Sequence, residues 1–121
     1  MASIRYLVND VDEAVAFYTG RLGFELRQQF GPAMAILGRG DLTLWVAGPQ
    51  ASAARPMPDG RKPQPGGWNR FVLPVGDLAA LVDQLRAQGV TFRNEIVKGV
   101  GGQQILCEDP SGNVIELFQA G

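Results

Sequence analysis

The 121-residue sequence contains no histidine and a single cysteine, Cys107. Without histidine there can be no histidine-dependent catalytic triad, no imidazole general base and few of the usual sites for first-row transition metals. One cysteine can form neither an intrachain disulfide nor a cysteine-only zinc cluster. We interpret Cys107 as an inert strand residue in a reduced, cytosolic setting. Any metal would have to be held by carboxylates and carbonyls, which suit Mg²⁺ or Ca²⁺.

The sequence also lacks a block of basic residues and a long apolar run. Its 11 basic and 12 acidic residues are scattered, so no stripe of Lys and Arg is available for the phosphates of a nucleic acid. The first ten residues, MASIRYLVND, contain no basic region followed by an apolar one. No apolar run approaches the ~18 residues of a membrane span. We therefore expect neither nucleic acid nor a membrane as a partner.

What the sequence does contain is an internal repeat. A strand-like stretch starting at Arg5 leads to Asp10, and a similar stretch starting at Arg70 leads to Asp77. Both aspartates are good helix N-caps, and Glu13 completes a capping box with Asp10. Apolar residues at helical spacing follow each aspartate, and each predicted helix then ends at a glycine. The repeat therefore predicts two amphipathic helices, each preceded by a strand.

Three further strands are expected after each helix. In the first copy they lie at about 24–28, 33–37 and 42–47, and in the second at 91–96, 103–108 and 114–119. Both modules are thus βαβββ units of an α+β fold. Neither can bury its sheet face alone, so we expect one domain over 1–121, with module one at about 2–47 and module two at about 68–119. The Pro- and Gly-rich segment 48–67 between them is a linker or a functional flap.

Several of these segments resemble the glyoxalase/bleomycin-resistance/extradiol dioxygenase superfamily, also called vicinal oxygen chelate proteins. The resemblance is carried by Phe17-Tyr18 and Leu22-Gly23-Phe24, by Gly89-Val90-Thr91-Phe92, and most specifically by the ending DPSGNVIELF at 109–118. It implies that the strands form a curved mixed sheet enclosing a cleft whose inner face holds a ligand or metal. It also implies a homodimer.

The resemblance further indicates where a metal would be held. The family's ligand positions fall on Ser3 and Arg70 in the first strand of each module, and on Leu44 and Glu116 in the last. Only Glu116 is a competent ligand, and one carboxylate cannot specify a divalent ion. We therefore expect no metal and no cofactor. The lactoylglutathione-lyase, extradiol-cleaving and fosfomycin-inactivating chemistries of the family are not expected either.

Strand alternation predicts which side chains line the cleft instead. The expected ligand-binding residues are Arg5, Leu7, Leu44, Trp68, Arg70, Glu116 and Phe118. Trp45 is expected to face the helices. Trp68 could stack on a planar ligand or pack under the linker, and Arg5 could contact an anion or remain a surface residue. Arg70 and Glu116 should lie on neighbouring strands and pair, either to satisfy two charges in the sheet or to present donors to a ligand.

Two functions fit this cleft. The first is a metal-independent binding protein of the bleomycin-resistance type, which sequesters a hydrophobic or planar antibiotic or metabolite. The second is a lyase or isomerase of the superfamily that uses Glu116 as a general base, with Arg70 or Arg5 stabilising an enolate-like charge. The predicted pairing of Arg70 with Glu116 favours binding, because a general base needs a carboxylate that is free to take a proton.

Overall fold

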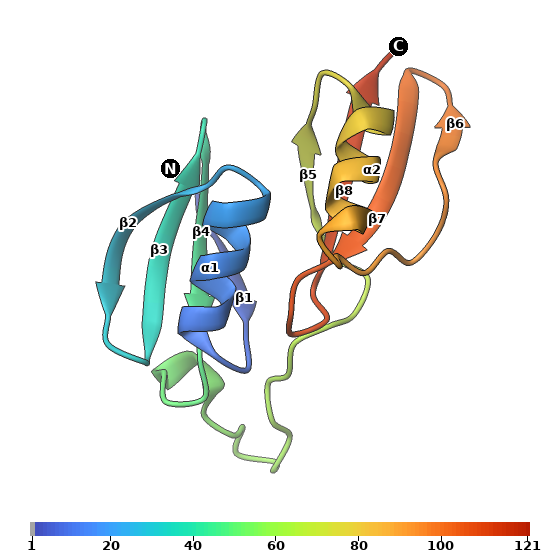
Figure 1. Ribbon diagram of the computed structural model, residues 1–121. Coiled ribbons are helices and arrows are strands. Elements are labelled where there is room, and N and C mark those ends of the chain that lie inside the picture. Colours follow the sequence, from blue (N-terminus) through green and yellow to red (C-terminus); the bar gives the residue numbers. More distant parts are fainter. Residues whose placement is uncertain (1) are drawn as a thin grey trace. The chain divides into compact units, whose positions relative to one another are not determined.

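Each half of the chain folds into one four-stranded mixed sheet with one α-helix (Figure 1). The computed structural model describes residues 2–121 and divides the chain into two compact units, one ending at Gly66 and the other spanning Gly67–Gly121. The predicted α+β fold of two βαβββ modules is confirmed. Most of the segment expected as a linker falls within the first unit and contains a short 3-10 helix, η1 (Ser52–Ala54).

The first unit contains β1 (Ile4–Leu7), α1 (Val11–Arg21), β2 (Glu25–Phe30), β3 (Met34–Arg39) and β4 (Leu42–Ala47). Its strand order is β1-β4-β3-β2, with β1 parallel to β4 and the other pairs antiparallel. The predicted helix cap is present, because the Asp10 carboxylate accepts a 2.9 Å hydrogen bond from the Glu13 N–H. Gly23 follows the helix at φ 72°, a conformation that glycine adopts without strain.

The second unit repeats this plan with β5 (Phe71–Pro74), α2 (Leu78–Ala87), β6 (Val97–Gly99), β7 (Gly102–Glu108) and β8 (Val114–Ala120). The strand order is β5-β8-β7-β6, with β5 parallel to β8. Asp77 caps α2 by accepting a hydrogen bond from the Ala80 N–H. Gly89 follows α2 at φ 83°.

One predicted strand is wrong. Residues 91–96 form no regular strand beside β7, only a single bridge between Phe92 and Cys107. The Arg93 N–H still donates to the Leu106 carbonyl, but the Leu106 N–H donates to the side-chain oxygen of Asn94. A side-chain acceptor thus takes the place of a backbone carbonyl and ends the ladder. The regular pairing starts only at β6.

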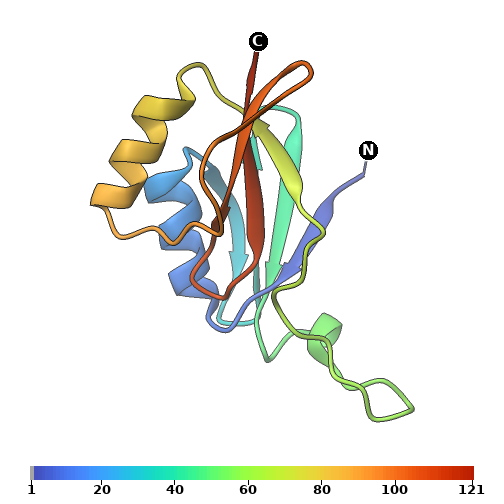
Figure 2. The ribbon, with the colours of Figure 1, turned by 90° about the vertical axis from the view of Figure 1, so that its right-hand side faces the viewer.

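Each helix covers one face of its own sheet (Figure 2). Beneath α1 lie fully buried side chains of the two central strands, among them Leu37, Leu44 and Val46. Beneath α2 lie Ile115 and Leu117 of β8. We call the opposite side the helix-free face of each sheet. Among residues 2–121, no helix is long and apolar enough to cross a membrane.

Candidate functional site

The helix-free face of the second sheet carries most of the predicted site residues. In the register of the sheet, Glu116 lies between Val72 of β5 and Leu106 of β7. Its neighbours Ile115 and Leu117 are buried on the helix side, so alternation directs Glu116 and Phe118 to the helix-free face. The structure therefore places Glu116 and Phe118 on the face that the sequence predicted.

Arg70 and Glu116 form the predicted ion pair on this face. The Nε and Nη2 atoms of Arg70 donate to the same Glu116 oxygen, at 3.0 and 2.9 Å, and Nη1 donates to the Trp68 carbonyl at 3.3 Å. The two side chains are 29% and 11% exposed. Such a charge-assisted double contact is stronger than a neutral hydrogen bond and fixes both groups. Glu116 is thus held by a cation and is not a free carboxylate.

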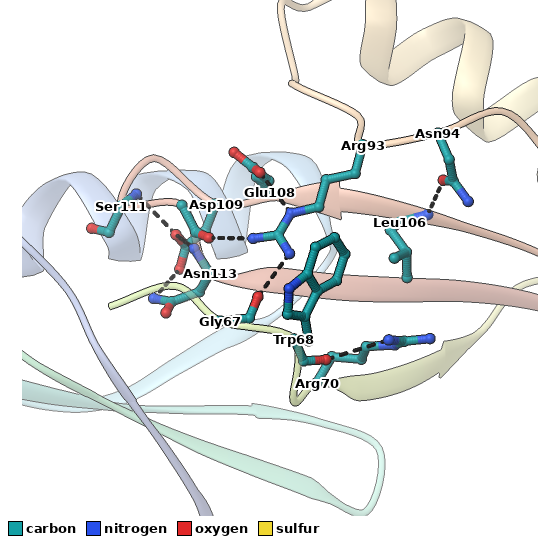
Figure 3. A network of polar contacts seen from close by, with 11 residues as sticks. Gly67, Trp68, Arg70, Arg93, Asn94, Leu106, Glu108, Asp109, Ser111 and Asn113 are labelled. Carbon is teal, nitrogen blue, oxygen red and sulfur yellow. Dashed lines mark hydrogen bonds and ion pairs between the residues drawn. The ribbon is translucent and has the colours of Figure 1, made fainter. Parts of the chain in front are cut away.

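Arg93 lies at the centre of a second network of polar contacts near this pair (Figure 3). The sequence pattern did not predict this network. Its Nε donates to Glu108 at 2.7 Å, Nη1 to the Gly67 carbonyl at 2.7 Å, and Nη2 to the Gly112 carbonyl at 3.0 Å. The guanidinium lies 4.5 Å from the centre of the Trp68 ring. Arg93 therefore ties the start of the unit to the turn before β8 and supports one face of the indole.

Trp68 remains accessible despite this stacking. It is 67% exposed, the highest exposure of any aromatic residue among the exposed large hydrophobic residues of the described chain. A planar cation on one side fixes the ring, because guanidinium groups stack favourably on indole. The stacking partner in the structure is Arg93, so a planar ligand would have to contact the part of the ring surface that Arg93 leaves exposed.

The ending 109–118, which carried most of the family resemblance, begins as the turn between β7 and β8 and continues into β8. Buried Asp109 accepts hydrogen bonds from the N–H groups of Ser111 and Asn113, at 2.9 and 3.0 Å, and from the Asn113 side-chain amide at 3.0 Å. The Gly112 carbonyl of this turn also accepts from Arg93. Figure 3 shows these contacts together. This motif therefore positions β8 and supports Arg93.

In the first sheet, the predicted face of two residues is wrong. Arg5 is paired in register with Trp45, and its guanidinium carbon lies 5.0 Å from the centre of that ring. Leu44 is fully buried beneath α1. Trp45, expected against the helices, is therefore on the helix-free face with Arg5, and Leu44, expected in the cleft, is in the core.

The error comes from the length of one turn. Arg39 and Leu42 pair directly across the β3–β4 hairpin, whereas Glu108 and Val114 pair across the longer turn between β7 and β8. The fourth residue after the turn glycine is Leu44 in β4 and Glu116 in β8. Because the two turns differ in length, these two residues do not occupy equivalent places in their sheets, and the place of Glu116 is taken in β4 by the residue after Leu44. A shift of one residue moves a side chain to the other face of a sheet. The residue of β4 equivalent to Glu116 is Trp45.

The donor set at these positions does not fit a divalent metal. With the corrected register, the family's ligand positions hold Ser3, Trp45, Arg70 and Glu116. The single carboxylate accepts two hydrogen bonds from an arginine. Within residues 2–121 there is no group of three or more acidic or cysteine side chains that could hold a metal ion.

Cys107 is a buried residue of β7. Burial raises the pKa of the Cys107 thiol to about 12, with a smaller contribution from Asp109 and Glu108, so the reactive thiolate is disfavoured. This agrees with the interpretation of Cys107 as an inert strand residue. Leu7, at the end of β1, lines a pocket of about 350 Å³ with prolines of the segment 48–65.

Comparisons with known proteins agree with this architecture. Residues 1–117 match the family model described as Glyoxalase/Bleomycin resistance protein/Dioxygenase superfamily. The structure resembles lactoylglutathione lyase from Agrobacterium tumefaciens, with a TM-score of 0.75 and 20% identity, covering 98% of this chain and 92% of that one. It resembles the fosfomycin resistance protein FosX from Listeria monocytogenes, with a TM-score of 0.75 and 14% identity, covering 100% and 93%.

A third similar structure is TnmS3, an antibiotic binding protein from Streptomyces sp. CB03234. Its TM-score is 0.71 and its identity 25%, and the match covers 100% of this chain and 97% of that one. The search of curated proteins finds no match. These structural likenesses support the fold, and they include proteins named as a lyase, a resistance protein and a binding protein.

Proposed function

The chain belongs to the glyoxalase/bleomycin resistance protein/dioxygenase superfamily, and we propose that it is a metal-independent protein that binds a planar, largely apolar small molecule. The observation that carries this proposal is the Arg70–Glu116 pair, which stands where the family holds a metal ligand. Trp68 beside it supplies an exposed aromatic surface next to guanidinium groups. Aromatic side chains with a few fixed polar groups are typical of small-molecule sites.

The same contacts disfavour the alternative, a lyase or isomerase with Glu116 as the general base. Such a base must accept a proton from a substrate within hydrogen-bond distance. Glu116 instead accepts two hydrogen bonds from a guanidinium that stays protonated at any physiological pH. The antibiotic binding protein among the similar structures has this fold in a binding role, and we extend that role to this chain.

The proposal is tested with a neutral planar dye, N-phenylnaphthylamine, whose fluorescence rises in an apolar site. We expect saturable binding that is unchanged by EDTA. Trp68→Ala should weaken binding by about 1–3 kcal/mol, the range of aromatic hot spots, which is about 5- to 150-fold in Kd. Trp68→Phe is the matched control, because it retains a ring for stacking. Absence of saturable binding, or loss of binding in EDTA, would contradict the proposal.

We also propose that the protein is a cytosolic homodimer. Each sheet ends in edge strands, β1 and β2 in one and β5 and β6 in the other, and exposed edges favour pairing with another chain. The single buried thiol suits a reducing compartment. Light scattering at micromolar concentration should therefore give twice the 13.0 kDa mass of one chain. A monomer mass under these conditions would refute the dimer.

A further inference from the structure

The arginines on the helix-free faces of the two sheets differ in whether a carboxylate pairs with them. In the second sheet, Arg70 is paired with Glu116 and Arg93 with Glu108. In the first sheet, Arg5 and Arg27 have no carboxylate within 4.0 Å among residues 2–121. The first face therefore carries two guanidinium charges that the protein does not neutralise by direct pairing.

Arg27 is directed onto this face by local backbone structure. The pairing of β2 with β3 shifts register between Leu26 and Gln28, so Arg27 sits in a β-bulge, a feature that re-aims a side chain. Its guanidinium lies directly against Gly38 of β3, where a Cβ atom would collide with it. Beyond Gly38, Nη1 of Arg27 lies 3.4 Å from the Thr43 hydroxyl of β4. The side chain thus crosses β3 through a gap that exists because residue 38 is glycine.

Arg5 reaches the same strand from the opposite edge of the sheet. It extends from β1 over the ring of Trp45 on β4. Thr43 and Trp45 are alternate residues of β4, so they share a face and lie about 7 Å apart along the strand. Two cations from opposite edge strands therefore converge on neighbouring positions of β4, beside an aromatic ring.

Among residues 2–121, no acidic side chain forms an ion pair with Arg5 or Arg27. Glu25 shares the face by its register with Gly38, but in the described chain it forms no ion pair with either arginine. Like charges brought together without a counter-charge repel each other, and an anion placed between them removes that cost. Guanidinium groups are well suited to carboxylate, sulfonate and phosphate oxygens because their N–H groups form a planar fork.

We propose that the helix-free face of the first sheet binds the anionic group of a planar ligand, with Arg5 and Arg27 on the anion and Trp45 against the ring system. The inference rests on the proposed binding function and concerns the first sheet alone, where it adds a site for the anionic group of a planar ligand. Gly38 is a positioning residue in this site, because it provides the gap that holds the Arg27 guanidinium over β4.

Two matched dyes separate this inference from the proposed function. Anilinonaphthalene sulfonate and N-phenylnaphthylamine share their ring system and differ by one sulfonate. We expect the sulfonate dye to bind more tightly, and Arg5→Gln and Arg27→Gln each to weaken it by about tenfold, the scale of one hydrogen bond to a charged group. The neutral dye should bind these variants within about twofold of the parent. Arg21→Gln, which removes the same charge from the last turn of α1, is the control and should change neither dye.

A second variant tests the geometry without changing the net charge. Gly38→Ala should displace the Arg27 guanidinium, a flexible group that can move away, and should weaken the sulfonate dye while leaving the thermal melting curve close to that of the parent. If both dyes bind equally well and no arginine variant affects the sulfonate dye, the anion site is refuted and the binding function stands. If neither dye binds, the binding function itself fails.

Discussion

Arg70→Ala is expected to lower the free energy of unfolding by about 2–3 kcal/mol, because it leaves Glu116 largely buried without its cation. Breaking a fully buried pair costs more, but Arg70 is 29% exposed and water screens part of the interaction. The truncation also removes the donor to the Trp68 carbonyl. Urea unfolding followed by circular dichroism measures the loss.

The double variant Arg70→Met with Glu116→Leu identifies the cause. Replacing both members of a buried pair by apolar residues of similar size is often neutral, since no charge is left unpaired. We therefore expect its stability to lie within about 1 kcal/mol of the parent. If the double variant is destabilised more than Arg70→Ala, the pair stabilises the fold beyond neutralising Glu116, and an unpaired carboxylate is not the main cause of the loss.

Leu44→Ala is expected to destabilise the protein by about 2–5 kcal/mol, the range for deleting a buried leucine side chain. Leu44 is fully buried beneath α1, so its removal leaves a cavity that the surrounding side chains can fill only in part. Trp45→Ala, at the next residue, is the matched comparison. It should cost less stability, because Trp45 is only half-buried on the helix-free face.

In ligand binding we expect the opposite order, with Trp45→Ala having the larger effect and Leu44→Ala the smaller. Trp45→Ala should weaken anilinonaphthalene sulfonate, whereas Leu44→Ala should bind it like the parent at temperatures where the variant is folded. Thermal melting and dye titration on the same samples give both quantities. A Leu44→Ala variant that melts like the parent but loses the dye would place Leu44 in the cleft, as its sequence pattern predicts.

The parts of the fold that were predictable from the sequence depend on short-range signals. Asp10 and Asp77 cap their helices through residues three positions ahead, and both caps are present. The pairing of Arg70 with Glu116 was predicted from the family resemblance, which puts both residues at ligand positions of neighbouring strands, and the structure shows the pair. The faces of Leu44 and Trp45 were not predictable, because they depend on how many residues the β3–β4 turn uses, and the glycine alone does not determine that number.

The contacts of Arg93 could not be predicted from the sequence for a different reason. Besides Glu108, its hydrogen-bond partners are the Gly67 and Gly112 carbonyls, 26 and 19 residues away in the chain. Any residue type can supply a carbonyl, so no pattern of side chains indicates these contacts. Arg27 is similar, since its direction follows from a β-bulge and from the space at Gly38. Such residues become visible only when backbone geometry is known.

The pairing of the first strand of each unit with its last strand has a consequence for how the protein is made. In the order β1-β4-β3-β2, the strand synthesised last lies between β1 and β3, and β8 has the same place between β5 and β7. Until that strand leaves the ribosome, β1 or β5 has no partner, and the hydrogen bonds that close the sheet link distant residues. Each unit therefore completes its sheet only when its own last strand emerges, and loss of β8 would leave β5 without a partner strand and β7 paired with β6 alone.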